Sequence, residues 1–188
     1  MSVDSGSTYK IRNAKSGTIL DLSGVDNTAI IGYPDHNGAN QQWVLTWTGR
    51  SWTFRSVSSN QYLGLEGSAG NGTKLLAVAQ PFEWHIWHDE TDQTTFRVFA
   101  PNTTYNFDLW NYGDPVPGDP ITLWTKWDGL HQTWRFERGE LAVLLLKQCR
   151  SLNVCNEQLI NRFHKEELKA DRYPVLMQSG LEPPADSM

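Results

Sequence analysis

Short apolar runs separated by turn residues make up most of the chain before residue 139. Residues 52–57 (Trp-Thr-Phe-Arg-Ser-Val) alternate apolar and polar side chains, and residues 58–61 (Ser-Ser-Asn-Gln) then interrupt the pattern. A period of two places the apolar side chains on one face of a β-strand. Clusters of Gly, Asn, Asp, Ser and Pro mark the turns between strands. The pattern predicts an all-β fold of short strands joined by tight turns.

The same succession of apolar runs occurs three times. The opening triplets are Leu20-Asp21-Leu22, Leu63-Gly64-Leu65 and Phe107-Asp108-Leu109, with central residues 43 and 44 positions apart. The closing residues are Trp43, Trp84 and Trp134, which we expect in the core. A unit this short cannot bury its apolar face alone and must pack against its copies. A propeller needs at least about four blades, so three units of four strands predict a β-trefoil, a closed barrel with a hairpin cap.

Two of the three repeats share a set of polar and aromatic residues. The first repeat carries Asp21, Tyr33, His36, Asn40 and Gln41. The third carries Asp108, Trp124, His131 and Gln132. The aromatic residue precedes the glutamine by eight positions in both. The second repeat has Gly64, Val78 and Phe82 in place of the acid, the aromatic residue and the glutamine. We therefore expect sites in the first and third repeats, with the principal one in the first.

In-phase Gln-x-Trp endings with an upstream Asp resemble those of the ricin B-type lectins, specifically the fungal β-trefoil members. The resemblance covers about residues 3–138, including the stretches 28–33 (Thr-Ala-Ile-Ile-Gly-Tyr) and 40–43 (Asn-Gln-Gln-Trp). It implies a carbohydrate-binding protein whose partners are glycans of the galactose, N-acetylgalactosamine or mannose type. No Gly-x-Ser-x-Gly or similar nucleophile motif is present in the sequence, so we expect no enzymatic activity, no cofactor and no metal.

The resemblance also implies roles for individual residues. Asp21 and Asp108 would accept hydrogen bonds from sugar hydroxyls, because a carboxylate makes stronger, charge-assisted bonds. Tyr33 and Trp124 would cover the apolar C–H face of the ring. Asn40 would bind a hydroxyl, since an amide both donates and accepts. In the remaining part of each site, Gln41 and Gln132 would brace the acid or the loop. His131 occupies a position that is usually Asn, so its site would differ in preference or strength.

Composition narrows the classes of function. The net charge is −5, which argues against a nucleic-acid partner. No apolar run approaches the roughly 18 residues of a membrane span, and the first residues lack the features of a signal peptide. Both cysteines, Cys149 and Cys155, follow the repeats, so we expect a reduced, cytoplasmic location. His85 and His88 are three apart on an expected strand and would face opposite sides, which disfavours a metal site.

Two other functions fit a β-trefoil of this length. Mushroom β-trefoils include cysteine-protease inhibitors, which act through exposed loops, and lectin-like companion subunits that bind no sugar. An inhibitor has no need for two acid–aromatic sets in phase, so the retained sets favour a lectin.

The spacing of apolar residues changes from a strand pattern to a helical pattern after residue 139. Residues 141–152 and 156–170 have apolar side chains at helical spacing, and residues 180–188 contain Pro183-Pro184. We expect a C-terminal extension over 139–188, helical and then disordered. An amphipathic helix must bury its apolar stripe, and this extension would either pack on the trefoil or pair two chains as a homodimer.

Overall fold

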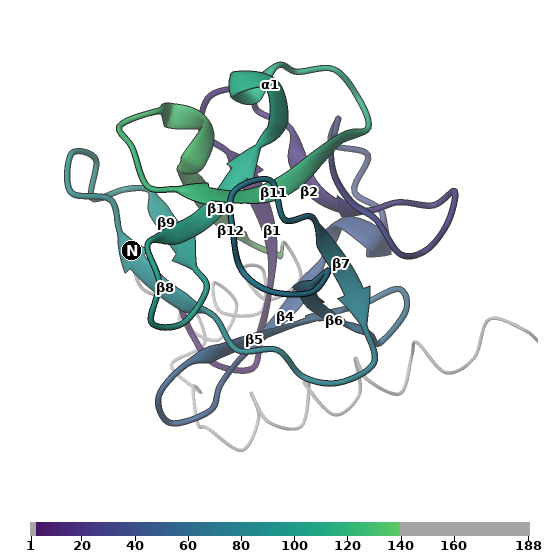
Figure 1. Cartoon of the computed structure of the whole chain (residues 1–188). Coiled ribbons are helices and arrows are strands. Elements are labelled where there is room, and N and C mark those ends of the chain that lie inside the picture. Colours follow the sequence, from purple (N-terminus) through teal and green to yellow (C-terminus); the bar gives the residue numbers. More distant parts are fainter. Residues whose placement is uncertain (1–2, 140–188) are drawn as a thin grey trace, which may run out of the picture. The chain divides into compact units, whose positions relative to one another are not determined.

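The structure is a computed structural model that describes residues 3–139 (Figure 1). The strands are β1 (Ser7–Asn13), β2 (Ile19–Leu22), β3 (Ile30–Tyr33), β4 (Trp43–Trp47), β5 (Trp52–Ser56), β6 (Tyr62–Leu65), β7 (Leu75–Val78), β8 (His85–His88), β9 (Phe96–Phe99), β10 (Tyr105–Leu109), β11 (Asp119–Thr125) and β12 (Trp134–Arg138). The helical turns are η1 (Ala39–Gln41), α1 (Trp110–Gly113) and η2 (Leu130–Gln132). Each repeat thus supplies four strands, which confirms the predicted all-β trefoil.

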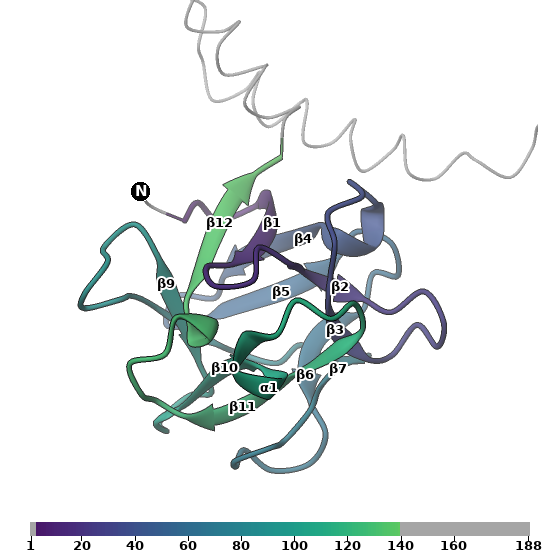
Figure 2. The same ribbon diagram turned by 90° about the horizontal axis from the view of Figure 1, so that it is seen from above.

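Strand pairing closes the sheet on itself. β1 pairs with β12 from Tyr9↔Arg138 to Asn13↔Trp134, so the first and last described strands lie side by side (Figure 2). Each repeat also contributes one hairpin: β2–β3, β6–β7 and β10–β11. Closure removes unpaired strand edges. The three hairpins are where the sequence places the acid, glycine and acid of the opening triplets.

The three closing tryptophans lie in the core and anchor the strands that carry the sites. Trp43, Trp84 and Trp134 are all fully buried. The indole nitrogen of Trp43 donates to the Leu20 carbonyl at 3.0 Å, and that of Trp134 donates to the Phe107 carbonyl at 3.4 Å. Each acceptor immediately precedes a site aspartate. The repeated tryptophan therefore stabilises the core and sets the position of the neighbouring carboxylate.

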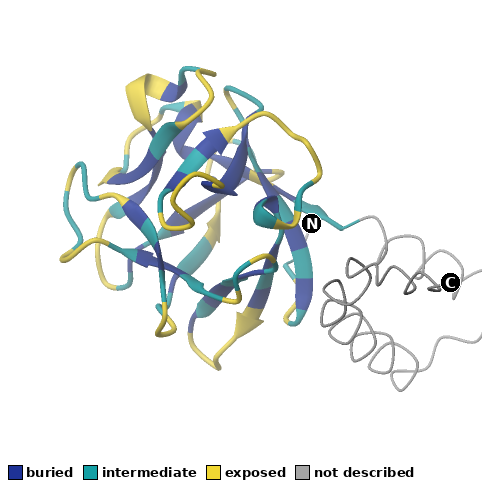
Figure 3. Ribbon diagram, turned by 90° about the vertical axis from the view of Figure 1, so that its right-hand side faces the viewer, coloured by how far each residue is buried: buried dark blue, intermediate teal, exposed yellow. Residues whose placement is uncertain are grey.

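Burial follows the alternation expected from the sequence. β1 alternates buried and half-buried residues along its whole length, and exposed residues gather in the loops and turns (Figure 3). No helix among residues 3–139 is long and apolar enough to cross a membrane.

The predicted helical extension and its role in a homodimer lie outside the described residues. They stay predictions.

Candidate carbohydrate-binding sites

The first repeat brings its five predicted residues together at the end of the β2–β3 hairpin. The Asn40 amide Nδ2 donates to Asp21 Oδ1 at 2.9 Å, and His36 Nε2 lies 3.3 Å from Asp21 Oδ2. Gln41 is buried and holds the intervening loop, since its Oε1 accepts from the His36 backbone N–H at 3.0 Å. The Tyr33 ring packs edge-on against His36 with centroids 6.0 Å apart. These contacts with the loop fit the bracing role predicted for Gln41.

Asp21 itself is almost fully buried. Burial raises the pKa of its carboxyl above the ordinary value, and its contacts with Gln41, His36 and Asn40 offset part of that rise. Desolvation acts in this direction because it penalises the charged form of an acid. The neighbouring side chains therefore offset only part of the cost of burying this carboxylate.

The third repeat holds Asp108 through a different set of contacts. Gln132 Nε2 donates to Asp108 Oδ2 at 2.8 Å, and His131 Nε2 lies 3.3 Å from the same oxygen. Both partners are buried. Among the described residues, no hydrogen-bond donor reaches Asp108 Oδ1. One carboxylate oxygen is fixed and the other remains to accept hydrogen bonds from a ligand.

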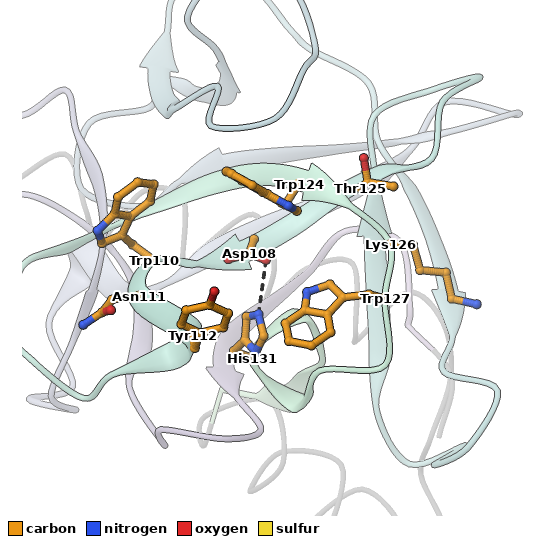
Figure 4. A pocket seen from close by; sticks show the side chains of 9 residues that line it. All are labelled: Asp108, Trp110, Asn111, Tyr112, Trp124, Thr125, Lys126, Trp127 and His131. Atoms are coloured by element: carbon orange, nitrogen blue, oxygen red, sulfur yellow. Dashed lines mark ion pairs between the residues drawn. The ribbon is translucent and has the colours of Figure 1, made fainter.

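A cavity of about 530 Å³ lies over Asp108 and has aromatic walls. Its lining residues are Asp108, Trp110, Asn111, Tyr112, Trp124, Thr125, Lys126, Trp127 and His131. Figure 4 shows Asp108 at the centre with the rings of Trp110, Trp124, Trp127 and Tyr112 around it. Flat aromatic faces around a single carboxylate combine a surface for C–H groups with an acceptor for hydroxyls.

The α1 turn forms one wall of the cavity with an unusual backbone. Asn111 and Tyr112 have φ angles of 52° and 56°, and Gly113 follows at 75°. A left-handed φ is costly for a bulky residue such as Tyr. The Tyr112 ring packs edge-on against Trp127 and His131, with centroids 6.1 Å away in both cases. A Cβ at Gly113 would lie 2.4 Å from His131 Cβ, so only glycine fits this close approach.

A buried ion pair contacts the residues that hold Asp108 and the loop of the third site. Arg97 Nε donates to Asp89 Oδ1 at 2.5 Å, and both side chains are buried. Arg97 Nη1 also donates to Gln132 Oε1 at 3.2 Å and to the Trp127 carbonyl at 3.0 Å. The amide of Gln132 is thereby fixed at both ends, because its Nε2 holds Asp108. The repeat pattern gives no indication of Arg97, because its contact with Gln132 joins residues 35 positions apart in the chain.

The second repeat lacks the components of a site. Gly64 lies where the acid stands in the other hairpins, opposite Leu76 in the β6–β7 pair. A Cβ at Gly64 would come within 2.5 Å of Val78 Cγ2. Val78 therefore occupies space that an acid side chain would need.

The two histidines of β8 have separate surroundings. The His88 ring packs against Phe96 with centroids 4.4 Å apart, and its Nδ1 lies 2.8 Å from the Gln93 carbonyl oxygen. The His85 ring instead contacts Trp87 at 6.0 Å. Within residues 3–139, no three His, Cys, Asp or Glu side chains are grouped as metal ligands would be.

Several residues that line the Asp108 cavity were not predicted from the sequence. They are Trp110, Asn111, Tyr112, Thr125, Lys126 and Trp127. One of them had a readable signal: Trp127 precedes Gln132 by five positions, as His36 precedes Gln41. The two backbone N–H groups make the same bond, from Trp127 to Gln132 Oε1 and from His36 to Gln41 Oε1, both 3.0 Å. The remaining residues lie in loops whose conformation no repeat pattern indicates.

Comparison with known proteins supports this reading of the fold. A family model described as "Ricin-type beta-trefoil lectin domain-like" matches residues 2–78. Among solved structures, the Macrolepiota procera ricin B-like lectin in complex with lactose is 58% identical, with a TM-score of 0.73 over 74% of this chain and 100% of that one. The Rhizoctonia solani agglutinin is 28% identical, with a TM-score of 0.67 over 74% of this chain and 99% of that one.

A designed threefold-symmetric protein, ThreeFoil, shares the fold at 22% identity and a TM-score of 0.64, over 69% of this chain and 97% of that one. A search of curated proteins finds no match. The chain belongs to the ricin B-like lectins.

Proposed function

We propose that this protein binds galactose-terminated glycans through Asp108 and Asp21, and that it acts by binding rather than by catalysis. The observation that carries the proposal is the Asp108 cavity: a carboxylate with one free oxygen among the described residues, surrounded by aromatic side chains. Support for galactose comes from the Macrolepiota procera lectin, which is 58% identical and was solved with lactose.

The geometry leads us to revise the expected ranking of the two sites. The positions after Asp21 hold Ser23, Gly24 and Val25, where those after Asp108 hold Trp110, Asn111 and Tyr112. The third site thus has more apolar surface for a sugar ring. We therefore assign the principal affinity to the third repeat and a weaker site to the first.

The test is calorimetry with lactose on variants that keep side-chain shape. Asp108→Asn removes the charge of the acceptor, and losing a bond to a charged group costs about 1.5–3 kcal/mol, or about 10- to 150-fold in affinity. Asp114→Asn is the matched control, because Asp114 lies in the neighbouring loop and does not line the cavity. Unchanged lactose binding by Asp108→Asn would contradict the assignment, and binding of methyl mannoside in place of lactose would contradict the choice of sugar.

Asp21→Asn gives a protein with the third site alone. The raised pKa of Asp21 means that its ionised form is disfavoured in the folded state. The neutral, isosteric amide should therefore leave the fold stable. With this variant, a one-site isotherm for lactose is expected.

A further inference from the structure

A second hollow, of about 490 Å³, lies beside the Asp108 cavity and belongs to none of the three repeat sites. Its apolar side consists of Trp87 on β8 and Phe99 on β9. Its polar rim consists of His85 and the turn residues 102–104 (Asn-Thr-Thr). We call it the Trp87 hollow. Trp87 is 61% exposed, an unusual degree for an indole side chain.

Lys126 joins the two depressions. It lines both the Asp108 cavity and the Trp87 hollow. Its backbone N–H donates to the Thr104 carbonyl at 2.9 Å, so the rim of the hollow is tied to the edge of the cavity. Figure 4 shows the Lys126 side chain pointing away from Asp108. The Lys126 ammonium pairs with Glu90 Oε1 at 2.9 Å. Because Lys126 lines both depressions, they meet at this side chain.

We propose that the Trp87 hollow is a subsite for the inner residues of a linear oligosaccharide whose terminal galactose occupies the Asp108 cavity. The inference rests on the proposed function. An exposed indole offers a face for the C–H groups of a sugar ring, and hydroxyl and amide groups at 102–104 can both donate to and accept from its hydroxyls. The rim residues and Lys126 are polar, which fits a sugar chain better than an apolar peptide segment.

The experiment compares galactose, lactose and a linear galactose-terminated tetrasaccharide on the full chain carrying Asp21→Asn, so that only the third site contributes. The tetrasaccharide should bind about three- to tenfold more tightly than lactose, the gain expected from one aromatic contact. Trp87→Ala should abolish that gain and leave the affinities for galactose and lactose unchanged. Because Trp87 is exposed, the substitution leaves the buried core intact, and an unchanged midpoint of thermal unfolding verifies this.

Trp47→Ala is the matched control. Trp47 is another half-exposed tryptophan. It shares a neighbouring depression with His85 and Trp87 but does not line the Trp87 hollow itself. The Trp47→Ala variant should bind all three sugars with the same affinities as the protein that carries Asp21→Asn alone. The subsite is refuted if the tetrasaccharide gains nothing over lactose, if Trp87→Ala weakens lactose equally, or if Trp47→Ala shows the same loss. Absence of any galactose or lactose binding would instead refute the proposed function itself, so the two failures are distinguishable.

Discussion

Replacement of Arg97 by Met should destabilise the protein strongly, because it leaves the buried Asp89 carboxylate without its counter-ion. Breaking a buried ion pair from one side costs about 3–5 kcal/mol. Asp89 Oδ2 keeps the backbone N–H groups of Thr91 and Asp92, both at 3.0 Å, so we expect a loss near the lower end, about 3 kcal/mol. Urea denaturation followed by tryptophan fluorescence measures it. A loss below about 1 kcal/mol, the range of exposed pairs, would refute the reasoning.

The matched control is Arg50→Met. Arg50 also pairs with an acid, Glu83 at 3.1 Å, but its side chain is 82% exposed. Solvent screens such a pair, so the expected change is at most about 1 kcal/mol. Lactose binding provides a second readout, because Arg97 also holds Gln132 and the Trp127 carbonyl. Arg97→Met should weaken lactose binding, whereas Arg50→Met should not.

The pH dependence of this loss follows from the pKa of Asp89. Burial alone would raise that pKa, but hydrogen bonds from Asp92 and Arg97 outweigh it and the net shift is downward. A carboxyl whose pKa is lower in the folded state than in the unfolded state stabilises the fold at pH values above its unfolded pKa. That stabilisation is lost as the pH falls through the pKa of the folded state. In Arg97→Met, protonation of Asp89 removes the uncompensated charge. The difference from wild type should therefore shrink in acid, and a difference that stays constant with pH would contradict an electrostatic origin.

Three further predictions concern the sites. Gly64→Asp should create no site in the second repeat, because its Cβ meets Val78, and a sugar found there in a soaked crystal would show otherwise. In Asp108→Asn, the remaining lactose binding should weaken as the pH falls toward the raised pKa of Asp21, because a protonated carboxyl is a poorer acceptor; titration at several pH values measures this. Agglutination of galactose-bearing cells should also fall in Asp108→Asn, since avidity can contribute about 10²–10⁴-fold when two sites engage one surface. Equal agglutination by a demonstrably monomeric variant would contradict a two-site protein.

The fold was predictable because a large buried side chain recurs at the same position of each repeat. Each repeat requires a large buried group that fixes its hairpin, and Trp43, Trp84 and Trp134 meet this need by donating to the residue before the centre of each opening triplet. The same periodicity located Asp21 and Asp108. A pattern of apolar and polar positions indicates short strands and their hairpins, and the threefold repetition of that pattern indicates how the hairpins pack together.

The walls of the third site were not predictable by the same means. Tyr112 lies in the cavity wall because its backbone is left-handed. Its ring contacts with Trp127 and His131, which favour this conformation, form only in the folded chain. Arg97 reaches Gln132 from another strand. Such contacts join residues far apart in the sequence and have no counterpart in the other repeats, so no periodicity indicates them.

A crystal structure of the full chain soaked with lactose would show directly whether Asp108 holds the sugar. Galactose should lie in the cavity of the third repeat, with a hydroxyl within hydrogen-bond distance of Asp108 Oδ1 and the ring against one of the aromatic walls. A cavity without sugar, in a crystal where lactose is bound elsewhere on the protein, would contradict it.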